Sequence, residues 1–419
     1  MTRPLAILNG RLVDPVAGTE AAGGLLLADR RIAAVGTFAI PDGAETIDAK
    51  GAMVAPGIVD IGVAAIDLPA FAAGGITRAA LMPDQSPPLD HPALVQRAAA
   101  AGKPDAWIHP LAAATRGLEG TELAEIGLMR AAGAPAVATG RARIADSGVM
   151  HRLLAYAGAL GLPVVTHAED EGLAAAAVAT AGETATRLGL PAAPAVAEAM
   201  AIARDVMLAE ETGARLHIRQ VTTAAGLALV RAAKARGVAV TCGITPAHLF
   251  LADSAVTGFR TFARLSPPLR CEDDRQACLA AIGDGTIDLI CSGHDPQGPE
   301  AKRLPFADAE PGMAGAETLL VLSLTLVRDG RLTLPRLMAM LSTAPADLLG
   351  LPPGRLAVGA EADLVIADIG RPWVIRSEAL AAQAGNTPFD GLPVQGRVIA
   401  TIKGGTRVSG GIGGGAGLS

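Results

Sequence analysis

The sequence contains few aromatic residues and few cysteines, and it has no long hydrophobic run. Aromatic residues make up 2% of the chain although 50% of its 419 residues are hydrophobic, so alanine and valine supply most of the apolar content. No apolar run approaches the roughly 18–20 residues that a membrane-spanning helix needs. The cysteines are far apart and form no CxxC pair, which is typical of reduced, buried thiols. They are Cys242, Cys271, Cys278 and Cys291.

The chain also lacks an excess of positive charge. It has 35 basic and 41 acidic residues, for a net charge of −6. A protein that follows the phosphates of a nucleic acid needs a basic face, so no nucleic-acid partner is expected. The first ten residues contain no basic stretch followed by a long apolar core, so no secretory signal is expected either. These absences predict a soluble cytoplasmic protein that does not bind membranes.

Between residues 55 and 351, short apolar segments alternate with longer segments rich in Ala, Leu, Arg and Glu. This alternation predicts βαβ units around a parallel sheet. The predicted strands are 57–63, 76–82, 106–112, 134–138, 162–167, 214–221, 237–242 and 286–292, and the helices between them include 90–101, 121–132, 148–160, 195–212 and 224–236. Eight strand positions fit a closed (β/α)8 barrel. A doubly wound sheet is less favoured because no GxGxxG opens the first βα unit.

Both ends of the chain are rich in short strands. Residues 5–14 alternate apolar and polar side chains around an Asn-Gly turn, and segments 24–36 and 45–54 extend this into a predicted antiparallel meander. The pattern returns at 355–368 and 394–408. The predicted domains are a β-sandwich from residues 1–54 plus 352–408, a barrel over 55–351 and a flexible glycine-rich tail over 409–419.

Several short motifs occur along almost the whole chain in an order typical of one family. They lie at 55–61, 73–77, 82–84, 167–170, 241–249, 266–270, 285–288, 315–318, 359–364 and 386–389. In these motifs the chain resembles the dihydroorotase branch of the amidohydrolase superfamily, specifically the bacterial class I enzymes. The resemblance implies a metal-bearing barrel with a small β-sandwich made from both chain ends, which agrees with the pattern of strands and helices.

The resemblance also implies two divalent ions held by histidines and a bridging anion, and this sequence lacks most of those ligands. The family's His-x-His pair after the first barrel strand corresponds to Gly62 and Ala64. The bridging anion falls in the stretch around Ala138, and the histidine after the sixth strand is replaced by Gln220. Only His167 is retained. Because Gly, Ala and Gln do not replace imidazole or carboxylate as ligands of a catalytic zinc ion, no metal is expected.

The positions for proton transfer and substrate binding are changed as well. The general-base aspartate of the family corresponds to Gly293, and the arginine that grips the substrate carboxylate corresponds to Ile66. Asp295 lies two residues after the general-base position, so the catalytic role is not transferred to it. The candidate residual contacts to a ligand are His167, His294, Asp84 and Ser266.

These losses predict a noncatalytic dihydroorotase-like protein, not an enzyme, with no cofactor. The resemblance then implies a structural or regulatory partner of aspartate carbamoyltransferase in pyrimidine biosynthesis, in a homo- or hetero-oligomer. One alternative is an active, zinc-dependent cyclic-amide hydrolase (a dihydroorotase that converts carbamoyl aspartate to dihydroorotate) with a site rebuilt from His167, His294 and Asp295. Another alternative is a small-molecule-binding module in which Arg270 or Arg219 holds an anion.

Overall fold

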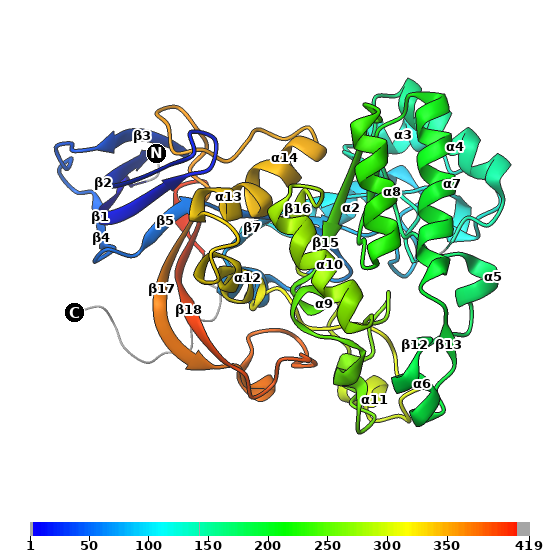
Figure 1. The fold of residues 1–419 in the computed structure, drawn as a ribbon. Coiled ribbons are helices and arrows are strands. Elements are labelled where there is room, and N and C mark those ends of the chain that lie inside the picture. The colour runs from blue at the N-terminus through cyan, green and yellow to red at the C-terminus, as the bar shows by residue number, and fades with distance from the viewer. Residues whose placement is uncertain (1–2, 142, 409–419) are drawn as a thin grey trace.

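The computed structural model describes residues 3–141 and 143–408. Within these ranges, a (β/α)8 barrel lies beside a β domain, which confirms the predicted fold class (Figure 1). The barrel strands are β6 (Ile58–Val63), β7 (Ile76–Leu81), β8 (Trp107–Pro110) continued by β9 (Ala112–Ala113), β10 (Val137–Ala138), β11 (Val164–Thr166), β14 (Leu216–Ile218), β15 (Val240–Ile244) and β16 (Leu289–Ile290). The predicted glycine-rich tail lies outside the described residues.

The barrel strands are parallel and form two hydrogen-bonded runs, one from β6 to β8 and the other from β9 to β16. The barrel closes where β16 meets β6. There the Ala64 amide donates to the His294 carbonyl over 2.8 Å, and the Ser292 amide donates to the Asp60 carboxylate over 2.8 Å. These contacts fix the first and last strands against each other and therefore position the loops that follow them.

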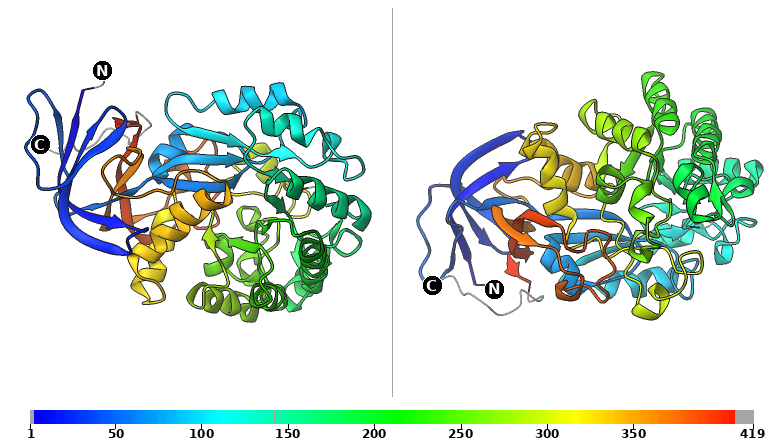
Figure 2. Two further views of the ribbon diagram at one scale, coloured as in Figure 1. Left: turned by 90° about the horizontal axis from the view of Figure 1, so that it is seen from above. Right: turned by 60° about the horizontal axis from the view of Figure 1, so that its bottom comes forward.

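Helices surround the barrel, as the two views of Figure 2 show. They are α1 (Leu68–Gly74), α2 (Pro92–Ala100), α3 (Ile126–Ala131), α4 (Ser147–Ala159), α5 (Glu171–Ala174), α6 (Glu183–Leu188), α7 (Val196–Thr212), α8 (Ala224–Ala235), α9 (Pro246–Phe250), α10 (Glu272–Gly283), α11 (Pro299–Lys302), α12 (Leu319–Arg328), α13 (Leu334–Met338) and α14 (Ala344–Leu348). A short ribbon of β12 (Ala179–Thr180) and β13 (Ala192–Ala193) lies near α6. No helix of the described ranges is long and apolar enough to cross a membrane.

The β domain is one mixed sheet that takes strands from both ends of the chain. Its strands are β1 (Leu5–Asp14), β2 (Thr19–Ala28), β3 (Arg31–Gly36), β4 (Glu45–Asp48), β5 (Met53–Pro56), β17 (Leu364–Val374), β18 (Pro393–Lys403) and β19 (Thr406–Arg407). The N-terminal and C-terminal strands meet where β5 pairs antiparallel with β17. Alternate side chains such as Ile7, Leu25 and Ile366 form its apolar core.

Three details of this sheet differ from the sequence predictions. The Asn-Gly pair makes no turn, because β1 runs through it with a bulge at Asn9, which has a φ of 53°. The N-terminal strands are not a purely antiparallel meander, since β4 and β5 both pair parallel to β1. The predicted strand at 355–368 begins only at Leu364. A local alternation of apolar residues therefore predicted the strands but not their pairing.

Candidate functional site

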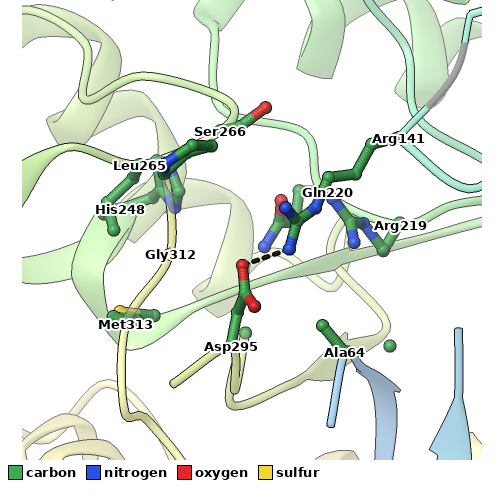
Figure 3. Close-up of a pocket in the computed structure, with 13 residues that line it drawn as sticks. Ala64, Arg141, Arg219, Gln220, His248, Leu265, Ser266, Asp295, Gly312 and Met313 are labelled. Carbon is green, nitrogen blue, oxygen red and sulfur yellow. Dashed lines mark hydrogen bonds and ion pairs between the residues drawn. The ribbon is translucent and has the colours of Figure 1, made fainter. Parts of the chain in front are cut away.

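A polar pocket lies at the carboxyl ends of the barrel strands, where (β/α)8 enzymes hold their active sites. Its walls come from segments that follow β6, β10, β14, β15 and β16 (Figure 3). The lining residues are Gly62, Ala64, Arg141, Arg219, Gln220, His248, Leu265, Ser266, Gly293, Asp295, Pro311, Gly312 and Met313. The structure thus brings together many of the positions that the sequence analysis singled out.

The residues of this pocket do not fit the two-metal centre that the family implies. Gly62 and Ala64 offer no donor atom, and Ala138 is buried within β10. In residues 3–141 and 143–408, no three His, Cys, Asp or Glu side chains are placed to hold a metal ion. The Arg219 side chain lies against Gly62, where an added Cβ would be 3.1 Å from Arg219 Cδ. A guanidinium group in this part of the pocket repels a divalent cation.

Two arginines and one aspartate supply the charge of the pocket. Arg219 follows β14, and Arg141 follows β10, where the Asp84 carboxylate accepts a 2.6 Å hydrogen bond from its amide. The Arg141 guanidinium forms an ion pair with Asp295, drawn as a dashed line in Figure 3. Arg219 lies beside this pair, and burial together with the charge of Arg141 lowers its pKa. Asp84 therefore positions the backbone of Arg141, while Asp295 holds its side chain.

His167 connects the pocket to a buried hydrogen-bonded network. Its Nδ1 accepts a long 3.4 Å hydrogen bond from Arg219, and its Nε2 lies 3.2 Å from the Glu169 carboxylate. Burial lowers the pKa of His167 despite this carboxylate. Burial alone would raise the pKa of Glu169, but hydrogen bonding from His167 and the charges of Arg270 and Arg143 hold it well below its usual range. The retained histidine thus holds Arg219 and does not line the pocket.

Arg270 and Glu198 form the centre of this network. Arg270 contacts Glu169 and Glu198, each over 3.3 Å, and its side chain is almost fully buried. Glu198, on α7, also accepts hydrogen bonds from the amides and hydroxyls of Thr222 and Thr223. Arg270 is thereby fully engaged by protein groups and does not line the pocket, contrary to the alternative in which it holds an anion.

The other two histidines of interest are both buried, and only one reaches the pocket. His248 lines it, but its Nδ1 bonds the Thr245 hydroxyl over 2.8 Å and its Nε2 bonds the Pro267 carbonyl over 3.0 Å. Burial lowers the pKa of His248 to about 4, so the ring is neutral at pH 7. His294 is not among the residues that line the pocket, and its Nε2 lies 3.4 Å from Asp67. A site rebuilt from His167, His294 and Asp295 together is therefore not present.

Sequence reasoning missed Arg141 and gave Asp295 little weight. Arg141 lies after the fourth strand, where the family's bridging anion was expected, and its basic charge was a signal that could have marked a change of chemistry. Arg219 precedes Gln220 and was considered only as an anion ligand. These side chains meet only in the folded barrel. Arg141 and Asp295, for example, are 154 residues apart in the sequence, and no local sequence pattern predicts such a contact.

Comparison of the sequence with known proteins identifies a family and several relatives of this chain. A family model described as dihydro-orotase-like matches residues 49–225. A dihydroorotase of Syntrophotalea carbinolica is 42% identical over 95% of this chain and 97% of its own. A dihydroorotase of Pelotomaculum thermopropionicum is 40% identical over 96% and 97%, respectively. A dihydroorotase-like protein of Pseudomonas aeruginosa is 39% identical over 95% and 97%.

Solved hydrolases have the same fold. The L-hydantoinase (dihydropyrimidinase) of Arthrobacter aurescens superimposes with a TM-score of 0.86 at 27% identity, covering 97% of this chain and 96% of its own. The dihydropyrimidinase of Brevibacillus agri gives a TM-score of 0.81 at 23% identity, covering 97% and 95%, which shows a common fold.

These relatives contradict the prediction that the chain is not an enzyme. Proteins 38–42% identical over nearly the whole chain are named dihydroorotase, and solved neighbours are hydrolases. That prediction rested on the replacement of the family's metal-ligand and general-base residues. Those losses do not account for Arg141, Arg219 and Asp295, whose charges can stabilise an anion and move a proton in the same pocket.

Proposed function

The chain belongs to the dihydroorotase-like family, and we propose that it is a cyclic-amide hydrolase that interconverts dihydroorotate and carbamoyl aspartate. The observation that carries this proposal is the meeting of Asp295, Arg141 and Arg219 at the mouth of the barrel. Hydrolysis of a cyclic amide requires one group that accepts a proton and another that stabilises the negative charge on the carbonyl oxygen. This pocket contains the Asp295 carboxylate for the first task, the N–H donors of Gln220 for the second, and two guanidinium groups that can bind an acidic substrate.

In the proposed reaction, Asp295 accepts a proton from the water that attacks the ring carbonyl. The side-chain amide of Gln220, which also lines the pocket, donates a hydrogen bond to the oxyanion that forms. The C–N bond then breaks, and the ring nitrogen takes the proton back from Asp295 as it leaves. Ring closure follows the same steps in reverse. The donor set gives no support to a metal in this sequence of steps.

Turnover of dihydroorotate and of carbamoyl aspartate by the purified chain tests this proposal. We expect Asp295→Asn to lower the rate by about 100-fold or more, because general-base catalysis contributes about 10²–10⁴-fold. Asp284→Asn is the matched control, since Asp284 is exposed and pairs with Arg231 on the barrel exterior. Rates equal to the buffer blank, with and without added zinc, would reject the hydrolase activity.

An association with aspartate carbamoyltransferase, implied by the resemblance, stays a prediction. Analytical ultracentrifugation of the chain with the transferase from the same organism tests it. A single faster-sedimenting species is expected, and separate sedimentation of the two proteins contradicts the association.

A further inference from the structure

Arg219 is a buried cation whose hydrogen-bonding capacity is largely unused. The residue is 7% exposed, and its Nε has no partner. In residues 3–141 and 143–408 the only hydrogen bond of its side chain is the long one to His167, although Asp84 and Asp295 lie near enough to raise its pKa. A guanidinium has five N–H donors, and burying them without acceptors costs free energy. Such an arrangement favours an anion that bonds Arg219 directly.

Other polar atoms around Arg219 are also without partners. Gln220 Oε1 and Asp84 Oδ2 are both buried and accept no hydrogen bond within the described ranges. Native proteins leave few buried polar atoms unpaired, and a cluster of them indicates a site that a ligand or water completes. A molecule that carries both an acid group and N–H donors, as a ureido acid or its cyclic amide does, would satisfy both kinds of atom.

The Arg141–Asp295 ion pair limits the room for a ligand beside Arg219. The enclosed part of the pocket leaves about 30 Å³ for the centres of water molecules, and a single water needs about 10–15 Å³ on the same measure. A six-membered ring needs more room than this. In Figure 3 the paired side chains of Arg141 and Asp295 lie beside Arg219 and Gln220, so separating this pair enlarges the pocket.

We propose that Arg219 and Arg141 together bind the carboxylate of the ligand, and that Asp295 competes with that carboxylate for Arg141. The chemical class of the ligand, a small cyclic amide or ureido acid with a free carboxylate, rests on the proposed function. The ligand carboxylate bonds Arg219 and replaces Asp295 as the partner of Arg141. Asp295 is thereby released and becomes free to take up a proton.

This site differs from the carboxylate site that the resemblance implies. There an arginine after the first strand grips the carboxylate, and here that position is Ile66. Arg141 and Arg219 approach from the segments after β10 and β14, on another part of the barrel. The cationic groups therefore lie at a different place from the family's arginine, and the ligand is expected to bind with its carboxylate toward β10 and β14.

Isothermal titration calorimetry with dihydroorotate tests the proposal, with dihydrouracil as the matched ligand that lacks the carboxylate. We expect Arg219→Met and Arg141→Met each to weaken dihydroorotate binding by about 10–100-fold, as the loss of a charge-assisted hydrogen bond does. Asp295→Asn should strengthen it several-fold, because the competing carboxylate is removed. Arg231→Met, which removes an exposed arginine remote from the pocket, is the control.

Each outcome separates this inference from the proposed function. If wild-type protein binds dihydroorotate no better than dihydrouracil, or if neither arginine variant changes the affinity, the carboxylate site is wrong even where turnover is found. If the arginine variants lose binding but no turnover is found, the carboxylate site is supported and the hydrolase is rejected. Because Arg141 is one-third exposed, its variant remains informative if Arg219→Met does not fold.

Discussion

Two buried arginines at the same end of the barrel differ in how many hydrogen-bond partners surround them. Arg270 contacts the carboxylates of Glu169 and Glu198 and the hydroxyls of Thr180 and Thr222. Arg219 has one weak hydrogen bond to His167. A buried charge that is fully paired contributes to a rigid structure, while a buried charge with unused donors costs stability and is available to a ligand. We therefore expect the paired groups around Arg270 to stabilise the barrel, and the unpaired donors of Arg219 to bind the ligand.

The largest expected effect is the loss of the paired region. Glu198→Ala would leave Arg270 and the two threonines that follow β14 with buried, unsatisfied donors. We expect the free energy of unfolding to fall by about 3–5 kcal/mol, as it does when one partner of a buried ion pair is removed. Urea unfolding followed by circular dichroism measures this loss.

The control for this variant is Glu300→Ala. Glu300 is 95% exposed, and its one ion pair, with Arg303, is long at 3.8 Å. Its removal should therefore change stability by less than about 0.5 kcal/mol. Equal losses in the two variants would show that the buried network does not support the fold.

A direct comparison of the two arginines is the next test. Arg270→Met is expected to destabilise by about 3 kcal/mol because it leaves two buried carboxylates without their common partner. Arg219→Met should be neutral or stabilising by about 1 kcal/mol, since it removes a buried charge that few groups satisfy. Chemical unfolding of both variants decides this, and a similar destabilisation of both would contradict the contrast between the two regions.

Gly62→Ala should have a smaller effect, at the contact between Arg219 and β6. Gly62 has a φ of +85°, and an added Cβ would be 3.1 Å from Arg219 Cδ, so both the backbone and the neighbouring side chain are strained. We expect a loss of about 1–2 kcal/mol in thermal or urea unfolding. Gly161→Ala is matched in backbone conformation, with a φ of +69°, but no atom lies near its added Cβ. A loss no larger than that of Gly161→Ala would show that Arg219 does not fill the space beside Gly62.

The barrel and the set of changed ligand positions could be predicted from sequence because both are local properties. Strand β6 and the glycine at position 62 are visible in a window of a few residues, as is the absence of a histidine there. The partners of Arg270 and Arg219 are not visible, because they come from segments that meet only in the folded barrel. Counting lost ligands therefore described which chemistry was absent, and only the structure placed Arg141, Arg219 and Asp295 together.

The bulge at Asn9 shows the same limit in the β domain. An Asn-Gly pair between alternating residues is a strong signal for a hairpin turn. Here β1 pairs with β2 on one side and with β4 and β5 on the other, and these pairings keep it extended through the bulge. Long-range strand pairing thus overrode the local preference for a turn.

A further expected effect is a pH dependence of stability that comes from His217, a buried side chain on β14. Its Nδ1 bonds the Thr241 hydroxyl over 2.8 Å, and its Nε2 has no partner within residues 3–141 and 143–408. Burial, with smaller contributions from Lys234 and Arg219, lowers the pKa of His217 to about 3. In the unfolded chain the pKa is near 6.5, so below that pH the unfolded state binds a proton that the folded state does not.

Stability from this group is therefore complete above about pH 6.5 and falls as the pH decreases toward 3. Between about pH 7.5 and about pH 5.5, wild-type protein should lose about 1.4 kcal/mol more than His217→Gln, because all other groups titrate alike in both. Urea unfolding at the two pH values measures the difference, and between about pH 7.5 and about pH 9 the two proteins should change in parallel. Identical losses on acidification would mean that His217 accepts a proton in the folded barrel, so that the interior beside Arg219 tolerates a second positive charge. That result would also weaken the argument that Arg219 needs an anion, because it would show that charge in this part of the barrel is already well solvated or paired.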